Sequence, residues 1–386
     1  MQSAPHDLSA QDRRRGIWAV LLLSFPAGAS YALVTPLMTV AMEARGHDAL
    51  AIGALAAVFP LAIMTVGPFV PLLVGRFGTA RTLLLSVLAS AAAVSVLPQF
   101  DGIVAWFLLR YVVGAAIAIV WIASETWLNV VAPPERRGLL LGAYASVLAS
   151  GIAAGPAVIA LFGTEGRGAY LAGAGILLLV ALPLLWAWRA VPVLPGQSPA
   201  SVLRVAGVAP LTMLVGLCAG FAETAIFGLL PVWALRQGMG PPSDLLLLSA
   251  FAVGNVALQV PFGRLLDRIE GRGVAAAVGV LAALFALLLA ASVGTWLVWP
   301  AIVLLGGATY AFYTVGLTLL GRRFPATQMA GANTAFVIAY TAGGVAGPTA
   351  AGWAMETAGP HGLLWTVALA SAALGGGAMV ARLQRR

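Results

Sequence analysis

Apolar residues run along this chain in long blocks that recur from one end to the other. Most blocks hold about 20 to 28 residues, and a helix of that length, rising 1.5 Å per residue, crosses a hydrocarbon layer of roughly 30 Å. Short polar or glycine- and proline-rich segments separate the blocks. The pattern predicts twelve membrane-spanning helices, at 17–42, 49–73, 80–98, 102–128, 138–162, 167–189, 205–235, 243–266, 272–292, 296–320, 327–355 and 361–382.

Composition agrees with this pattern. Of the 386 residues, 61% are hydrophobic and 9% are charged, and the mean hydropathy is +0.98. An ordinary soluble domain has about 25% charged residues. We therefore expect an all-α integral membrane protein. The first apolar block is too long for a cleaved signal sequence, so we expect it to stay as the first span.

The positions of the basic residues predict the orientation in the membrane. All 21 are arginine; if the N-terminus is cytoplasmic, 17 of them lie on cytoplasmic segments. Arg45, Arg167 and Arg236 lie on the other side, and Arg110 alone lies within a span, a distribution that follows the positive-inside rule. The net charge of +8 is thus explained by topology, with both termini in the cytoplasm of a bacterial inner membrane. We therefore expect the chain to lie in a lipid bilayer as a monomer, and we expect it not to bind nucleic acid.

Missing residue types exclude several chemistries. The chain has no lysine, which a phosphate-binding Walker loop requires. Its single cysteine, Cys218, and its three histidines are scattered, so no cluster has the spacing of metal ligands. No nucleophile and base are paired within the spans. We expect neither cofactor, metal nor enzymatic activity.

The second half of the sequence repeats the first at an offset of 192 residues. The matching positions are Gly28 with Gly220, Arg76 with Arg268, Gly114 with Gly306, and Gly151, Gly155 and Pro156 with Gly343, Gly347 and Pro348. This predicts two six-helix, pseudo-symmetric halves, 1–190 and 205–386, joined by a cytoplasmic linker at 191–204. Glycines let helices approach and proline can bend them, so we expect these glycine-proline segments at a tight seam between the halves.

Two basic loops occupy equivalent places in the halves: GRFGTAR at Gly75–Arg81 and GRLLDRIEGR at Gly263–Arg272. Asp267 lies among Arg264, Arg268 and Arg272, where a carboxylate can accept hydrogen bonds from free N–H groups at a helix start. We weigh two readings equally. The loops form a gating latch with Arg76, Asp267, Arg268 and Arg272, or they are solvated loops that obey the charge rule.

The paired halves, the two loops and the GxxxGP helix resemble the major facilitator superfamily of secondary transporters, over essentially the whole chain. The likeness is greatest to small bacterial members with a drug-efflux-like layout. Gly263-x-Leu265-x-Asp267-Arg268 matches the family's loop signature, whereas Gly75 stands where its first copy has an acid.

Two further motifs carry the resemblance. Arg110-x-x-x-Gly114 is similar to the family's fourth-helix motif, which is associated with proton or substrate handling. Gly142, Gly151 and Gly155-Pro156 are similar to the fifth-helix motif of exporters that exchange substrate for protons, although Ile159-Ala160 replaces its trailing glycine pair.

Three charged residues lie inside the predicted spans, away from the span ends. Arg110 lies near the middle of its span, where a charge costs about 2.5 to 3.5 kcal/mol unless it meets water or a partner. Arg110 therefore has two possible roles. It binds the solute or takes part in proton transfer, or it holds helices together. Glu223 is our first choice for a proton carrier, because a carboxyl group in a span can exchange protons. A static ion pair with Arg110 is its alternative, and for Glu125 we favour a structural or gating salt bridge with Arg136 or Arg137.

In the family that the chain resembles, helices one, four, seven and ten line the central cavity. This resemblance implies a lining of Tyr31, Trp121, Phe227, Tyr310 and Tyr313, with Arg110 and Trp121 facing Glu223. Each aromatic residue can instead be packing or interfacial. Asn255 and Gln259, spaced i,i+4, either line the cavity or join helices.

The sequence thus predicts a secondary transporter that moves a small organic solute by alternating access, with proton-coupled export as the first hypothesis. The alternative is uptake of a carboxylate-bearing metabolite at Arg110, by proton symport or facilitated diffusion. A non-transporting receptor or scaffold is a third, less favoured hypothesis, because the chain has no soluble signalling domain.

Overall fold

The computed structural model describes residues 9–133, 136–163, 166–192, 207–268, 271–324 and 326–384. Most of the predicted linker therefore lies outside the described residues. Within the helices, the side chains of 137–138, 259–260, 263–268 and 326–331 are also outside the description. All regular structure in the described parts is helical.

The helices overlap the predicted blocks, and some blocks, such as 49–73, contain more than one helix. They are α1 (Ala10–Ala44), α2 (Ala49–Val66), η2 (Gly67–Phe69), α3 (Val70–Phe77), α4 (Thr79–Val96), η3 (Leu97–Gln99), α5 (Ile103–Val131), α6 (Arg137–Phe162), α7 (Gly168–Leu179), α8 (Ala181–Trp186), η5 (Trp188–Ala190), α10 (Pro210–Arg236), α11 (Ser243–Arg268), α12 (Gly271–Ala291), α13 (Val298–Arg323), α14 (Ala326–Thr357) and α15 (Gly362–Leu383). Over the described residues, ten helical segments are long and apolar enough to cross a membrane, and α11 adds a shorter apolar stretch.

Several hydroxyl groups inside the helices donate hydrogen bonds to carbonyls of their own helix. Ser24 donates to the carbonyl of Val20, Ser30 to that of Pro26, and Thr35 to that of Tyr31. Such bonds reduce the cost of placing a hydroxyl in an apolar layer. The helix α1 continues through Pro26 and Pro36.

Packing divides the chain into two compact units. The first holds Met1–Met38 and Ala62–Ser198, and the second holds Thr39–Leu61 and Pro199–Arg386. The end of α1 and the first part of α2 thus pack with the C-terminal helices. We did not predict this exchange of Thr39–Leu61; the boundaries predicted at 190 and 204 stay a prediction.

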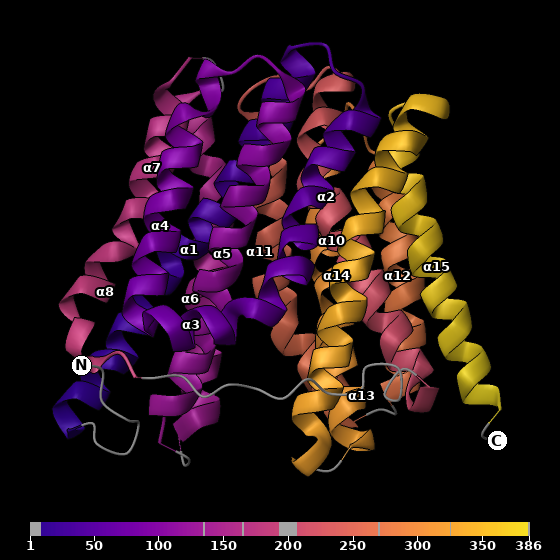
Figure 1. The fold of residues 1–386 in the computed structure, drawn as a ribbon. Coiled ribbons are helices and arrows are strands. Elements are labelled where there is room, and N and C mark those ends of the chain that lie inside the picture. Colours follow the sequence, from indigo (N-terminus) through magenta and orange to yellow (C-terminus); the bar gives the residue numbers. More distant parts are fainter. Residues whose placement is uncertain are drawn as a thin grey trace. The chain divides into compact units, whose positions relative to one another are not determined.

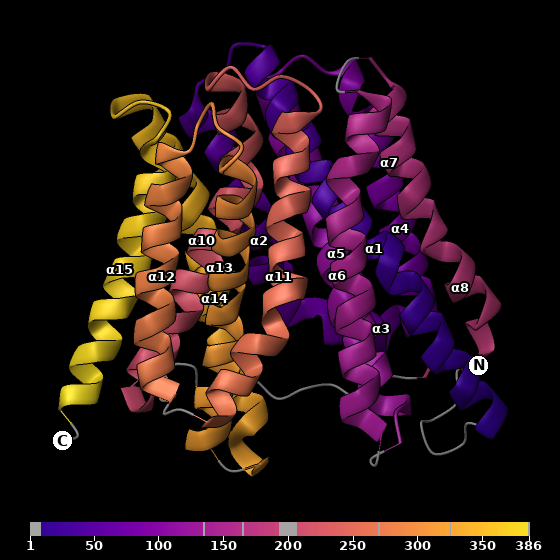
Figure 2. The same cartoon turned by 180° about the vertical axis from the view of Figure 1, so that it is seen from behind.

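The first unit is built on α4, which packs against both α5 and α7, as Figure 1 shows in violet and magenta. Its buried core joins residues of α1, α4 and α5, including Leu23, Val87 and Trp127. In the second unit α10 is central, packing against α11, α13, α14 and α15, while α12 packs against α13 and α15 (Figure 2). Its core includes Val215, Phe312 and Phe336.

Glycine contacts join α6 to α1 in the first unit. A methyl group built on Gly151 would overlap the carbonyl of Phe25, and one on Gly28 would overlap that of Leu148. Gly155 lies equally close to Ala29. These helices therefore touch backbone to backbone.

The second unit repeats the same three contacts between α14 and α10. Gly343 meets the carbonyl of Leu217, Gly220 that of Tyr340, and Gly347 that of Phe221. Each partner lies 192 residues beyond its equivalent in the first unit. The glycines thus lie at backbone contacts inside each unit, and the seam between the halves that we predicted for them stays a prediction.

Beyond this contact, α14 meets the start of α2. A methyl group on Gly53 would overlap the carbonyl of Pro348, and one on Gly352 would overlap that of Ala49. On α10, a methyl group built on Gly228 would likewise overlap the Cβ atom of Ala56. Small residues therefore explain why Thr39–Leu61 belongs to the second unit.

We predict that Gly343→Ala lowers the stability of the protein, because its methyl group would push α14 away from Leu217 of α10. The expected cost is about 1 to 3 kcal/mol, as for other overpacked sites. It is measured as a lower unfolding temperature of the detergent-purified protein. Gly376→Ala is the matched control, since a methyl group there meets open space. Equal unfolding temperatures for the two variants would contradict this account of the contact.

Candidate solute- and proton-binding residues

A carboxyl–phenol pair joins α10 to α14 in the second unit. The Tyr340 hydroxyl donates a hydrogen bond to Oε2 of Glu223, with an O···O distance of 2.7 Å. The glycine contact makes this possible, because Gly220 brings α10 against the backbone of Tyr340 one turn before Glu223. Both side chains are half-buried. The sequence analysis predicted Glu223 but missed Tyr340.

Two series of aromatic rings lie near this pair, and Tyr340 belongs to the first of them. In the first, Tyr313 of α13 packs edge-on against Tyr340, with centroids 5.6 Å apart, and against Phe336 at 5.3 Å. In the second, Phe251 of α11 contacts Phe227 at 5.8 Å and Tyr310 at 5.5 Å. Tyr310 also lies close enough to act on the carboxyl group of Glu223. The predicted residues Phe227, Tyr310 and Tyr313 are therefore gathered around Glu223.

Glu223 forms no ion pair with any described basic side chain of its own unit. Among the side chains of the second unit that the structure describes, the ion pairs are those of Arg236 with Glu43 and Glu356. Tyr340 contributes only a neutral hydrogen bond. A carboxylate in this position needs a cation, and a proton is the smallest.

Arg110 lies in a different environment, inside the first unit. Its side chain is 1% exposed, and Nη2 donates to Oγ1 of Thr35 on α1 at 2.6 Å. Tyr31 is near enough to interact electrostatically with the guanidinium group. Thr35 was missed by the sequence analysis, because one threonine among many gives no signal. The contact holds α5 to α1.

The other predicted residues of α5 do not join Arg110. Gly114 is buried in the first unit, whereas Trp121 is 37% exposed. Glu125 is exposed, close to Tyr144 of α6, and its carbonyl accepts a hydrogen bond from Asn129. Among the described side chains, Glu125 forms no ion pair with Arg136; the side chain of Arg137 is not described.

The predicted latch lies largely outside the described side chains, which exclude those of Asp267 and Arg268. Arg76 is exposed, with its guanidinium 5.7 Å from the ring centroid of Phe77. Arg272 donates to the carbonyl of Ala381 on α15 at 3.0 Å. Asn255 of α11 is half-buried, and the side chain of Gln259 is not described.

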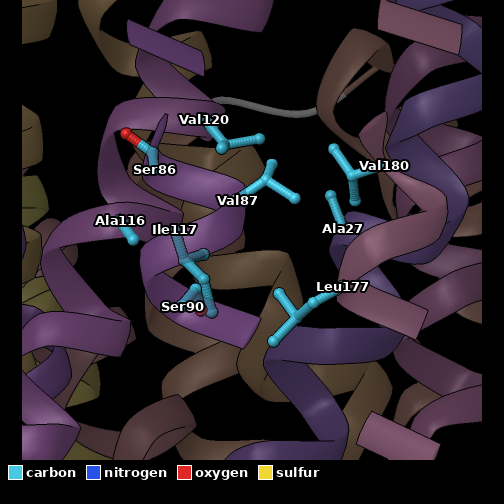
Figure 3. A pocket seen from close by; sticks show the side chains of 9 residues that line it. All are labelled: Ala27, Ser86, Val87, Ser90, Ala116, Ile117, Val120, Leu177 and Val180. Carbon is cyan, nitrogen blue, oxygen red and sulfur yellow. The ribbon is translucent and has the colours of Figure 1, made fainter. Parts of the chain in front are cut away.

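A small cavity inside the first unit has room for about one water molecule (Figure 3). Its lining is Ala27, Ser86, Val87, Ser90, Ala116, Ile117, Val120, Leu177 and Val180. The lining is apolar apart from Ser86, which donates to the carbonyl of Thr82, and Ser90. We interpret the cavity as a packing defect and not as a solute site.

An arginine clamp, made of Arg236, Glu43 and Glu356, was not predicted. Arg236 at the end of α10 donates from Nε and Nη2 to the two carboxylate oxygens of Glu43, at 2.8 and 3.0 Å, and from Nη1 to Glu356 at 2.8 Å. Glu356 also accepts the backbone N–H of Ala49 at 2.7 Å. The clamp fixes the ends of α1, α10 and α14 and the start of α2.

The sequence model of the Major Facilitator Superfamily matches residues 20–248 and 212–386. The chain belongs to the Major Facilitator Superfamily. It is therefore a membrane protein from a family of secondary transporters, and the resemblance found in the sequence is confirmed.

Other members of the superfamily match most of the chain. It is 24% identical over 360 residues to the MFS-type transporter YfkF of Bacillus subtilis (strain 168), and the match covers 91% of each protein. It is 26% identical over 279 residues to the MFS-type transporter Ent638_1421 of Enterobacter sp. (strain 638), covering 72% of each.

Two solved structures share the fold. The nucleoside transporter NupG has a TM-score of 0.74 at 15% identity, covering 96% of this chain and 98% of that one. A bacterial homologue of the human lysosomal transporter Spinster, inward-facing and occupied, has a TM-score of 0.77 at 15% identity and covers 98% and 99%. At this identity the likeness establishes the fold alone.

We predict that Arg236→Gln destabilises the protein, because it leaves Glu43 and Glu356 facing each other without a cation. Hydrogen bonds to charged groups contribute about 1.5 to 3 kcal/mol each, and partial exposure of the clamp reduces this, so a loss of about 1 to 3 kcal/mol is expected. It is measured as a lower unfolding temperature in low salt. Arg167→Gln, at an exposed arginine, is the matched control. A variant as stable as the control would show that the clamp contributes nothing.

Proposed function

We propose that this chain exports a small organic solute across a bacterial inner membrane in exchange for protons. The single observation that supports the coupling is Glu223, a half-buried carboxyl group on a membrane helix, hydrogen-bonded to Tyr340 and without a basic partner among the described side chains of its unit. A charge held in an apolar layer costs several kcal/mol, about 2.5 to 3.5 on insertion scales. The carboxyl group must therefore bind a proton or a cationic solute before it can pass through an occluded state.

The titratable groups that face Glu223 are Tyr340 from α14 and Tyr310 from α13. Neither carries a positive charge that would hold the carboxylate permanently ionised. Alternating exposure of Glu223 to the two sides of the membrane would then move one proton per cycle. The aromatic rings beside it supply the surface on which a solute binds.

The proposed architecture has twelve spans in two halves of six, with both termini in the cytoplasm. The glycine contacts of α1 with α6 and of α10 with α14, repeated at an offset of 192 residues, support the duplication. The distribution of arginines supports the orientation. Arg110 and Trp121 remain proposed contributors from the first half.

We expect Glu223→Gln to abolish proton movement that is coupled to solute, because the amide cannot take up or release a proton. Solutes are first chosen from a panel of organic acids, vitamins, nucleosides and amines by the rise in unfolding temperature that they cause. Proton movement is then recorded in proteoliposomes with an entrapped pH-sensitive dye. Asp101→Asn, at an exposed loop acid, makes the same chemical change outside the site and should retain coupling.

Uptake of a carboxylate-bearing metabolite is the alternative function. It requires the solute to reach Arg110, which is buried on Thr35 in this structure. Full gradient-driven transport by Glu223→Gln, together with loss of counterflow of an organic acid in Arg110→Lys, would overturn the proposal and establish this alternative.

The Asp267 latch remains a proposal from the sequence. If Asp267 closes the cytoplasmic side, Asp267→Asn should favour the inward-open state by about two- to fivefold, the size of one interaction between a carboxylate and a helix dipole. The measurement is the labelling rate of single cysteines introduced into the outer and inner turns of α1 and α10, with Cys218 replaced by serine. Unchanged labelling at both ends would show that Asp267 is only a solvated loop residue.

A further inference from the structure

Exposed arginines gather at one end of the first unit, where α1, α4 and η5 meet. They are Arg14 and Arg15 of α1, Arg81 of α4 and Arg189 of η5, called here the arginine cluster. In Figures 1 and 2 the end of α8, which leads into η5, lies beside the first turns of α1.

Two backbone contacts bring the three elements together. A methyl group built on Gly16 of α1 would lie 3.6 Å from the carbonyl oxygen of Ala190. The hydroxyl of Thr79, at the start of α4, donates to the carbonyl of Pro192 at 2.8 Å. Each arginine of the cluster lies within two residues of one of these contacts, so side chains that are far apart in the sequence share one small surface.

The arginine cluster forms no ion pair with the acids that the structure describes. In the first unit these acids are Asp12, Asp101 and Glu125. Asp12 accepts the hydroxyl of Ser9 at 2.7 Å, and Asp101 follows the far end of α4. Over the described residues, the ion pairs are those of Arg236 in the second unit. The charge of the cluster is therefore available to an anion.

An apolar surface continues from the cluster along two helices. On α1 the large side chains of Trp18, Leu22 and Phe25 are exposed, and their spacing of four and three residues places them on one helix face. Trp18 follows Arg14 by four residues, so this face begins at the cluster. On α8 the exposed large side chains are Leu182, Leu185 and Trp186.

A phospholipid carries the same sequence of groups. Its phosphate can accept paired hydrogen bonds from guanidinium groups, and its acyl chains can cover the apolar faces. Indole rings prefer the level between headgroups and chains, which is where Trp18 and Trp186 would lie. A zwitterionic headgroup would bring a second cation towards the arginines, whereas an anionic headgroup such as phosphatidylglycerol would not. A free phosphate ion would use the arginines and leave the apolar faces uncovered.

We propose that the arginine cluster binds the headgroup of an anionic phospholipid, whose acyl chains lie along the exposed faces of α1 and α8. The bound phosphate joins α1, α4 and η5 and so stabilises this end of the first unit. The inference goes beyond the proposed transport function and does not depend on the solute or on the direction of transport.

The test compares two phospholipids that have the same chains and different headgroups. Detergent-purified full-length protein is titrated with dioleoyl phosphatidylglycerol, which is anionic, or with dioleoyl phosphatidylcholine, which is zwitterionic. Native mass spectrometry resolves the lipid-bound states and gives the affinity for each lipid. We expect the anionic lipid to bind about tenfold or more tightly, because each arginine near a membrane surface contributes about fivefold.

The double variant Arg15→Gln/Arg189→Gln removes two arginines of the cluster. It should bind phosphatidylglycerol about tenfold or more weakly, while binding of phosphatidylcholine stays the same and shows that the variant is folded. Arg136→Gln/Arg323→Gln is the matched control, because both arginines are exposed and lie outside the cluster. The control should keep the preference for the anionic lipid.

Inorganic phosphate distinguishes a lipid site from a site for a free anion. Unfolding temperatures are measured with phosphatidylglycerol and with sodium phosphate, each against sodium chloride at equal ionic strength. We expect the lipid to raise the unfolding temperature of the unmodified protein and of the control, but not that of the double variant. Phosphate should leave all three unchanged.

Three results would overturn the inference. The first is equal affinity of the unmodified protein for the two phospholipids. The second is a double variant that keeps the preference for the anionic lipid. The third is stabilisation by inorganic phosphate as large as that by the lipid, which would assign the arginine cluster to a free anion.

Discussion

The backbone contact between α10 and α14 is the constraint on which the second unit depends. Gly220, Gly343 and Gly347 have no side chain to separate the helices, so each lies on a carbonyl of its partner. In an apolar layer water does not drive helices together, and close packing of small residues is the main source of association. This contact places Tyr340 beside Glu223, and it places the end of α14 beside α2. The candidate site is therefore a consequence of helix packing.

The same contact in the first unit carries different side chains. Tyr31 occupies the position of Glu223, and Leu148 occupies that of Tyr340. Duplication would explain how one backbone arrangement came to support an apolar junction in one unit and a carboxyl–phenol pair in the other. In the first unit Tyr31 lies near Arg110, which donates a hydrogen bond to Thr35.

The charged side chains of this protein differ in the partners that surround them. Arg236 lies at a helix end, where two carboxylates and a backbone N–H complete a network with four hydrogen bonds. Arg110 lies within a span and is covered by its own unit. Glu223 meets the phenols of Tyr340 and Tyr310 and forms no ion pair with a described side chain of its unit, and this imbalance is the physical basis for proposing that it carries a proton.

The sequence by itself determined the class of protein, the helices and the family. Apolar blocks of membrane length, loops rich in arginine and the 192-residue repeat are local or periodic features, and each can be read without knowing which helix meets which. Glu223 was found in the same way, because an acid within an apolar block is conspicuous.

Only the tertiary structure decided which side chains form hydrogen bonds with the charged residues. Tyr340, Thr35 and Glu356 lie far along the chain from Glu223, Arg110 and Arg236, and no spacing rule connects them. The repeat contained one usable signal for these contacts. Gly28 with Leu148 and Gly220 with Tyr340 are equivalent pairs, so one contact predicts the other, but only after one of them is known. Helix pairing depends on which small residues of two helix surfaces contact each other. A single sequence shows which residues each helix carries, but it does not show which helices are in contact.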